Sequence, residues 1–136
     1  MTANAAWESL LTAHAILMKQ FAAEDIWAEV SMREYDVLYT LSKGPVNITD
    51  LNRHVLLSQP ALSRMVDRLA ARGLIERCPD PADGRGRRLS LTDEGRAVQR
   101  QIGRRHARGV ARAVSTALTP ADQRQLETLC RKLARQ

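Results

Sequence analysis

Two short helix patterns followed at once by a hairpin pattern, between residues 47 and 91, constrain the fold of this 136-residue chain more than any other feature. Asn47 is the expected N-cap of a short helix whose apolar positions are Ile48, Leu51 and Val55. After a tight connection, Ser58 is the expected N-cap of the next helix. Two short helices that are each apolar on one face and joined by a minimal turn are typical of a helix-turn-helix.

Glycine and proline delimit the elements that come after this helix pair. The helix that begins at Ser58 is expected to bury Leu62, Val66 and Leu69 and to end at Gly73. Residues 74–78 predict a short strand, residues 79–86 a turn with two prolines, two glycines and two aspartates, and residues 88–91 the returning strand. A hairpin directly after a helix-turn-helix predicts a winged helix.

Longer amphipathic helices flank this lobe. Residues 5–28 predict a helix about 35 Å long, and its apolar stripe is Trp7, Leu10, Leu11, His14, Leu17, Met18 and Phe21. A capping box of Ser31 and Glu34 opens the second helix, and Thr92 and Thr119 cap the fifth and sixth. We therefore expect a mostly α chain, a winged helix-turn-helix of six helices and a small β-hairpin wing, with long helices suited to dimerisation.

Positive charge is concentrated in the middle of the chain. The net charge is +6, and residues 51–112 alone carry +8, since they hold fourteen basic and six acidic side chains. All fourteen are arginine, which suits bidentate contacts to phosphate and guanine, although codon bias toward arginine is an alternative source. An acidic partner such as nucleic acid is therefore favoured. An aromatic fraction of 4% is low for a protein that stacks single-stranded bases.

The helix that begins at Ser58 carries the side chains that are expected to contact DNA. These are Ser58, Gln59, Ala61, Ser63, Arg64 and Arg68. The first turn of a recognition helix enters the major groove, where Gln59 suits adenine and Arg64 suits guanine. Asn47 and Thr49 of the preceding helix are further expected contacts. Each residue alone is equally consistent with a solvated polar face, whereas the order of caps, turn and hairpin favours DNA reading for the set.

The expected wing is rich in arginine. Arg85 lies at a glycine-flanked tip and suits insertion into a minor groove, and Arg87 and Arg88 follow it. Asp83 would repel DNA if it faced the duplex, so we expect it to hold Arg85 or a neighbouring cation and so to support the wing. An ordinary exposed hairpin is the alternative.

These motifs resemble the multiple-antibiotic-resistance regulator (MarR) family of winged-helix transcription factors. Residues 62–69 (LSRMVDRL) and 72–75 (RGLI) resemble its recognition helix and first wing strand, and residues 80–85 (DPADGR) and 89–95 (LSLTDEG) resemble its wing. Gly84 departs from the family, which often has arginine there. The resemblance implies a homodimer on a pseudo-palindromic duplex, with dimerisation by residues 1–30 and 93–136 and DNA binding by residues 31–92. It also implies repression that a small effector or cysteine oxidation relieves.

The sequence offers two candidate ways of relieving repression, an effector pocket and cysteine oxidation. An effector pocket between the dimer helices and the reading head, as the resemblance implies, would take His14, Met18 and Tyr35, although core packing is the alternative for each. Cys78 and Cys130 are interpreted as structural thiols, with a redox role as the alternative. The scattered histidines predict no metal site, and we expect no cofactor.

Three classes of function are compatible with this pattern. A sequence-specific regulator is favoured, and an architectural binder without sequence choice or a protein-interaction module are the alternatives. An enzyme is not expected, because no nucleophile–base pair or phosphate loop is found. Without a long apolar run or a secretion signal, the chain is expected to be cytoplasmic and without membrane contact.

Overall fold

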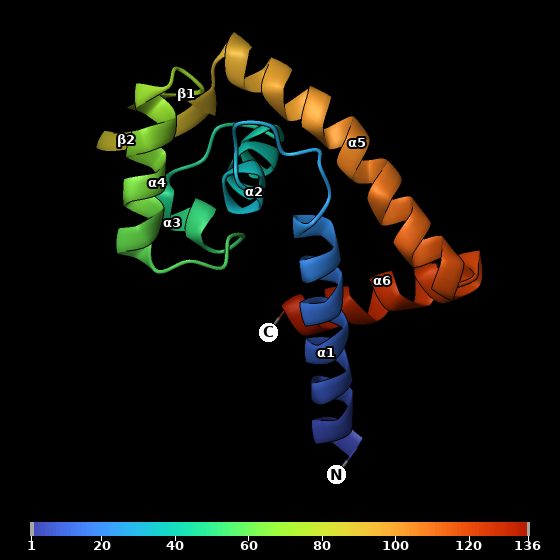
Figure 1. Ribbon diagram of the computed structural model, residues 1–136. Helices are drawn as coiled ribbons and strands as arrows, with labels where there is room; N and C mark the ends of the chain where they lie inside the picture. Colours follow the sequence, from blue (N-terminus) through green and yellow to red (C-terminus); the bar gives the residue numbers. More distant parts are fainter. Residues whose placement is uncertain (1, 136) are drawn as a thin grey trace. The chain divides into compact units, whose positions relative to one another are not determined.

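Figure 1 shows the computed structural model, in which residues 2–135 are described, apart from the side chains of Asp83 and Arg85. The elements in chain order are α1 (Thr2–Ala22), α2 (Met32–Leu41), α3 (Ile48–Asn52), α4 (Gln59–Ala71), β1 (Ile75–Asp80), β2 (Asp83–Leu91), α5 (Asp93–Ala117) and α6 (Pro120–Ala134). This confirms the mostly helical fold with one hairpin. Within the described residues, no helix has the length and apolar character needed to cross a bilayer.

The chain divides into two compact units. Asp25–Arg104 form one, which we call the lobe, and α1 with the chain after Arg104 forms the other. Nearly all described buried apolar residues lie in the lobe, with Phe21 as the exception. Leu38, Leu51, Leu62 and Leu69, from three different helices, are fully buried there. Burial of this kind is the main stabilising term for the helix-turn-helix.

Side-chain caps begin the lobe helices where the sequence predicts. The capping box at the start of α2 is complete, since Glu34 N donates to Ser31 Oγ at 3.0 Å and Ser31 N donates to Glu34 Oε1 at 2.8 Å. Asn47 Oδ1 accepts from Asp50 N at 2.8 Å to cap α3, and Ser58 Oγ accepts from Ala61 N at 3.3 Å to cap α4. These caps satisfy N–H groups that the first turn of a helix leaves without partners.

The hairpin is longer than the sequence predicts. β1 and β2 pair antiparallel from Ile75–Leu91 to Pro79–Arg87, and only residues 81–82 form the turn. The expected turn over 79–86 is therefore mostly strand. The register shifts between Pro79 and Asp80, and a proline without an N–H is tolerated beside such an irregularity.

A third segment pairs with the outer edge of β2. Val46, in the loop before α3, forms a two-residue bridge with Leu89, because Leu89 N donates to Val46 O at 2.7 Å and Val46 N donates to Leu89 O at 3.2 Å. The bridge joins the entry of the helix-turn-helix to the wing strand.

Helix α1 ends six residues earlier than predicted, at Ala22 instead of residue 28. Trp27 and Val30 are buried in the lobe, and Ala28 adopts a left-handed φ of 55° between them. The left-handed φ of Ala28 is incompatible with a continued α-helix, so both side chains reach the lobe from a segment outside α1. Neither glycine nor proline marks this point, which explains why the sequence predicts a longer helix.

Candidate nucleic-acid interface

The turn between α3 and α4 is fixed from both sides. Val55 is buried beneath it, and Asn52 Nδ2 donates to Leu57 O at 3.0 Å. The backbone of Leu57 also donates to Val55 O at 2.9 Å. Because both backbone polar groups of Leu57 are paired and the Val55 side chain is buried, this short connection sets the direction in which α4 leaves α3.

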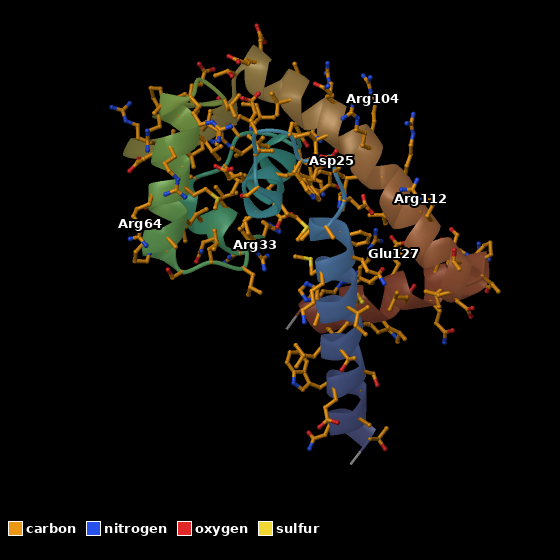
Figure 2. All side chains as sticks on the ribbon, viewed as in Figure 1. Asp25, Arg33, Arg64, Arg104, Arg112 and Glu127 are labelled. Atoms are coloured by element: carbon orange, nitrogen blue, oxygen red, sulfur yellow. The ribbon has the colours of Figure 1, made fainter. Side chains whose placement is uncertain are left out.

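Helix α4 presents a polar face to solvent. Leu62, Met65, Val66 and Leu69 are buried on the inner side. Gln59, Arg64 and Arg68 are exposed on the outer side, and we call these three the reading face (Figure 2 labels Arg64). Among the described side chains, neither arginine of this face has an ion-pair partner. The face therefore offers two guanidinium groups and one amide to a ligand.

The remaining predicted contacts lie at or near the start of these helices. Ser58 is exposed, whereas Ala61 and Ser63 are half-buried. Asn47 is half-buried and uses its side-chain oxygen in the α3 cap, and Thr49 is exposed in the first turn of α3. The hydroxyl of Ser58 and the amide oxygen of Asn47 accept backbone hydrogen bonds, so both residues position their helices whether or not they touch a ligand.

An ion pair that the sequence did not predict links the reading helix to the wing. Arg77 on β1 contacts Asp67 on α4 through Nη2 and Oδ1. The sequence alone predicts only a polar surface for this stretch of α4. The two residues lie ten positions apart on different elements, so no helix or strand periodicity could have paired them.

The far end of α4 is anchored to the start of α2. Arg72 Nη1 donates to Glu34 Oε2 at 3.2 Å, and Arg72 Nη2 donates to Glu29 O at 2.8 Å. Glu34 uses its other carboxylate oxygen in the capping box. The Glu34 side chain is 12% exposed and that of Arg72 is 34% exposed, so only the carboxylate is well shielded from solvent.

The wing is described in part. The side chains of Asp83 and Arg85 lie outside the described residues, so their expected roles stay predictions. Arg87 is exposed and Arg88 is half-buried. Both belong to β2, which places their positive charge on the hairpin.

The junction between the wing and α5 is tightly packed. Thr92 N donates to Leu74 O at 3.2 Å, and Thr92 Oγ1 donates to Gly73 O at 2.6 Å. Thr92 Oγ1 also accepts from Gly95 N at 3.0 Å and so caps α5. A Cβ added at Gly95 would lie 1.9 Å from Leu74 O. Only a glycine at position 95 permits the start of α5 to approach the backbone of Leu74 this closely.

The three residues named for an effector pocket lie in different units. Tyr35 is buried in the lobe, where its ring centroid is 5.5 Å from that of Trp27. Desolvation by burial raises the pKa of Tyr35 above its ordinary value, although a hydrogen bond with Gln99 lowers it in part. His14 is exposed and Met18 is half-buried, both on α1.

The two cysteines are far apart in the sequence and lie on different elements. Cys78 on β1 is half-buried, and its Sγ donates to Arg88 O at 3.6 Å. Cys130 on α6 is also half-buried. Neither residue forms a disulfide, which is consistent with the interpretation of both as thiols.

Comparison with known proteins places this geometry in a family. A model described as the MarR family matches residues 29–86. The chain is 30% identical over 106 residues to the multiple antibiotic resistance protein MarR of Salmonella typhimurium, a match that covers 77% of this chain and 74% of that protein.

Solved structures are similar over almost the whole chain. Sco3205, a MarR family transcriptional regulator from Streptomyces coelicolor solved in complex with DNA, has a TM-score of 0.80 and 29% identity, covering 96% of this chain and 84% of that one. The PcaV transcriptional regulator from the same organism, solved in complex with its natural ligand, has a TM-score of 0.67 and 31% identity, covering 93% and 87%.

Proposed function

The chain belongs to the MarR family of transcriptional regulators, and from that membership we propose that it binds duplex DNA as a homodimer and represses transcription until a small-molecule effector releases it. The observation that carries this proposal is the reading face of α4. It combines exposed Gln59, Arg64 and Arg68 with a helix start that is fixed by the Ser58 cap and by the buried Val55 in the turn before it. Sco3205, which has this fold, was solved with DNA.

The proposed contacts divide into base reading and positioning. Arg64 suits bidentate pairing with guanine and Gln59 with adenine in the major groove. Ser58, Ala61, Ser63 and Arg68, together with Asn47 and Thr49, contact or position the backbone. Arg85, Arg87 and Arg88 extend the contact into the adjacent minor groove, with Asp83 supporting the wing.

Apolar surface outside the lobe supports the proposed homodimer. Trp7, Leu11 and Ile16 on α1 are 50–60% exposed, and Leu126, Leu129 and Leu133 on α6 are 45–57% exposed. Apolar side chains gathered on long helices in this way mark an association surface. We propose that residues 1–30 and 93–136 form the dimer and that residues 31–92 bind DNA.

Release by an effector is proposed because PcaV, 31% identical to this chain, was solved with its natural ligand. His14, Met18 and Tyr35 remain the proposed contact residues. We also propose that the protein acts in the cytoplasm, where chromosomal DNA lies in bacteria, and that it has no catalytic activity, since the relatives are named as regulators.

The proposal is tested by DNA binding to the region upstream of the protein's own reading frame. Arg64→Ala should weaken binding by about 1–3 kcal/mol, roughly 5- to 150-fold, and relax base preference at one position in each half-site. Arg124→Ala on α6, which removes an exposed arginine far from the reading face in the sequence, is the matched control. Half-sites should be centred about ten base pairs apart.

The outcomes separate the alternatives. A uniform loss for Arg64→Ala on every duplex would assign Arg64 to phosphate contact instead of base reading. Equal affinity of the unchanged protein for all duplexes would favour an architectural binder, because a regulator should prefer its site by roughly a thousandfold or more. Arg85→Ala should reduce the protection of the minor groove in footprints, and an unaltered footprint would contradict its proposed role.

A further inference from the structure

Helix α5 carries an uninterrupted excess of positive charge. No aspartate or glutamate occurs between Glu94 and Asp122, a stretch that holds six arginines. Four of these follow one another at intervals of four residues and are all exposed, and we call them the arginine ladder: Arg100, Arg104, Arg108 and Arg112 (Figure 2 labels the second and the fourth). Residues four apart are neighbours on a helix surface, so the ladder is a continuous row of guanidinium groups.

The ladder lies away from the packed side of α5. Ile102 is 3% exposed and Gly109 is buried, and these residues are seven positions apart, which places them on one side of the helix. At 3.6 residues per turn, Arg100, Arg104 and Arg108 project to the other side of the helix, and Arg112 lies at its border. All four side chains are exposed. The row is therefore open to solvent along its length.

The ladder also lacks partners that arginines elsewhere in the chain have. Arg33, Arg72, Arg77 and Arg131 each contact a carboxylate. Within the described side chains, no ladder arginine has an ion-pair partner. Like charges four residues apart destabilise a helix. A ligand that carries repeated negative charge would remove this repulsion.

We propose that the arginine ladder binds the phosphate backbone of duplex DNA, as a contact separate from the reading face of α4, so that DNA contact extends beyond residues 31–92 onto the exposed side of α5. Its twelve-residue span is about 18 Å long, and a duplex presents roughly ten phosphate charges over that length. A guanidinium group matches phosphate in a bidentate geometry. An acidic protein segment is the competing ligand. Duplex DNA is favoured because the proposed function already includes duplex binding by this chain. The choice of DNA as the ligand therefore rests on the proposed function.

The test compares two variants that lose the same charge. One replaces the ladder (R100Q, R104Q, R108Q and R112Q). The control replaces three exposed cations of α6 and the exposed arginine at its C-cap (R124Q, R131Q, K132Q and R135Q). Binding to a long duplex of random sequence is measured between about 50 and 200 mM salt. The ladder variant should lower the slope of log affinity against log salt by about 3–4, with at least a roughly tenfold loss of affinity at the lowest salt. A ladder variant with the slope and affinity of the control would overturn the proposal.

Two further measurements keep the result interpretable. Thermal unfolding without DNA should show no loss of stability in the glutamine variant, because the substitution removes like-charge repulsion. An arginine-to-lysine ladder should retain most of the salt slope, since it keeps the charge. Polyglutamate binding that depends on the ladder, with duplex binding unchanged, would overturn the proposal in favour of an acidic protein partner.

The outcomes also separate this inference from the proposed function. If the ladder variant matches the α6 control while Arg64→Ala loses base preference, the ladder proposal fails and the proposed function stands. If the ladder variant loses its salt slope while the unchanged protein prefers no sequence, the ladder proposal stands and sequence-specific regulation fails.

Discussion

Replacing Gly95 with alanine should destabilise the lobe, although alanine is the better helix former. The new Cβ would lie 1.9 Å from the carbonyl oxygen of Leu74 and 2.9 Å from its carbonyl carbon. Both obstacles are backbone atoms, so no side-chain rotation can relieve the contact. The start of α5 would have to move away from the segment that precedes β1.

The expected loss of stability is set by the contacts that this movement breaks. Thr92 would lose its backbone bond to Leu74 and its side-chain bond to Gly73, and each is worth about 1 kcal/mol. Overpacking strain adds about 1–3 kcal/mol. The better helix propensity of alanine returns about 1 kcal/mol. The free energy of unfolding should therefore fall by about 2–4 kcal/mol.

Gly103→Ala is the matched control on the same helix. Its Cβ would meet the side-chain ends of Gln99 at 3.0 Å and Tyr35 at 3.1 Å. Neither obstacle is a backbone atom and both contacts are much longer than the one at Gly95, so we expect a change within about 1 kcal/mol. Urea unfolding at one fixed protein concentration compares the two variants, since dimerisation would make stability depend on concentration. The reasoning is refuted if Gly95→Ala unfolds at the same urea concentration as Gly103→Ala, or at a higher one.

Three further changes test single contacts. Ser58→Ala should lower the free energy of unfolding by about 1 kcal/mol because α4 loses its cap; an unchanged urea midpoint would contradict that role. Tyr35 has a pKa raised by burial above 10.0, so its contribution to stability is complete below that pH and is lost as the pH rises through the higher folded value. Urea midpoints of wild type and Tyr35→Phe should diverge with pH in this range, and parallel curves would show that Tyr35 is not responsible. Asp67→Ala removes the exposed ion pair with Arg77, so stability should change by less than about 1 kcal/mol. DNA affinity should fall, because this pair links the wing to the reading helix. A fall in stability without any change in DNA binding would show that the pair does not position the wing for DNA.

The elements that the sequence predicts well are those with local signals. Ser31, Asn47, Ser58 and Thr119 each accept a backbone hydrogen bond from the third residue of the helix that they cap. Such a cap needs only neighbouring residues, so its pattern is visible without knowledge of the fold. The order of helix-turn-helix and hairpin is predictable from these signals together with Gly73, whose φ of 76° ends α4.

Contacts between distant segments were not predictable in this way. The Asp67–Arg77 pair depends on how β1 returns alongside α4, and the Val46–Leu89 bridge depends on a loop reaching a strand 43 residues later. The early end of α1 depends on the burial of Trp27 in the lobe. Each of these results from tertiary packing, which overrides local preference and leaves no periodic pattern.

The Val46–Leu89 bridge also limits how copies of this chain can associate. A two-stranded hairpin has two open edges, and an open edge can recruit a strand from another molecule into a growing sheet. Leu89 directs both of its backbone groups to Val46, so β2 cannot accept a foreign strand at that point, and the charged side chains of Arg87 and Arg88 oppose one beside it. Strand exchange through the β2 edge of the wing is thereby disfavoured at this point.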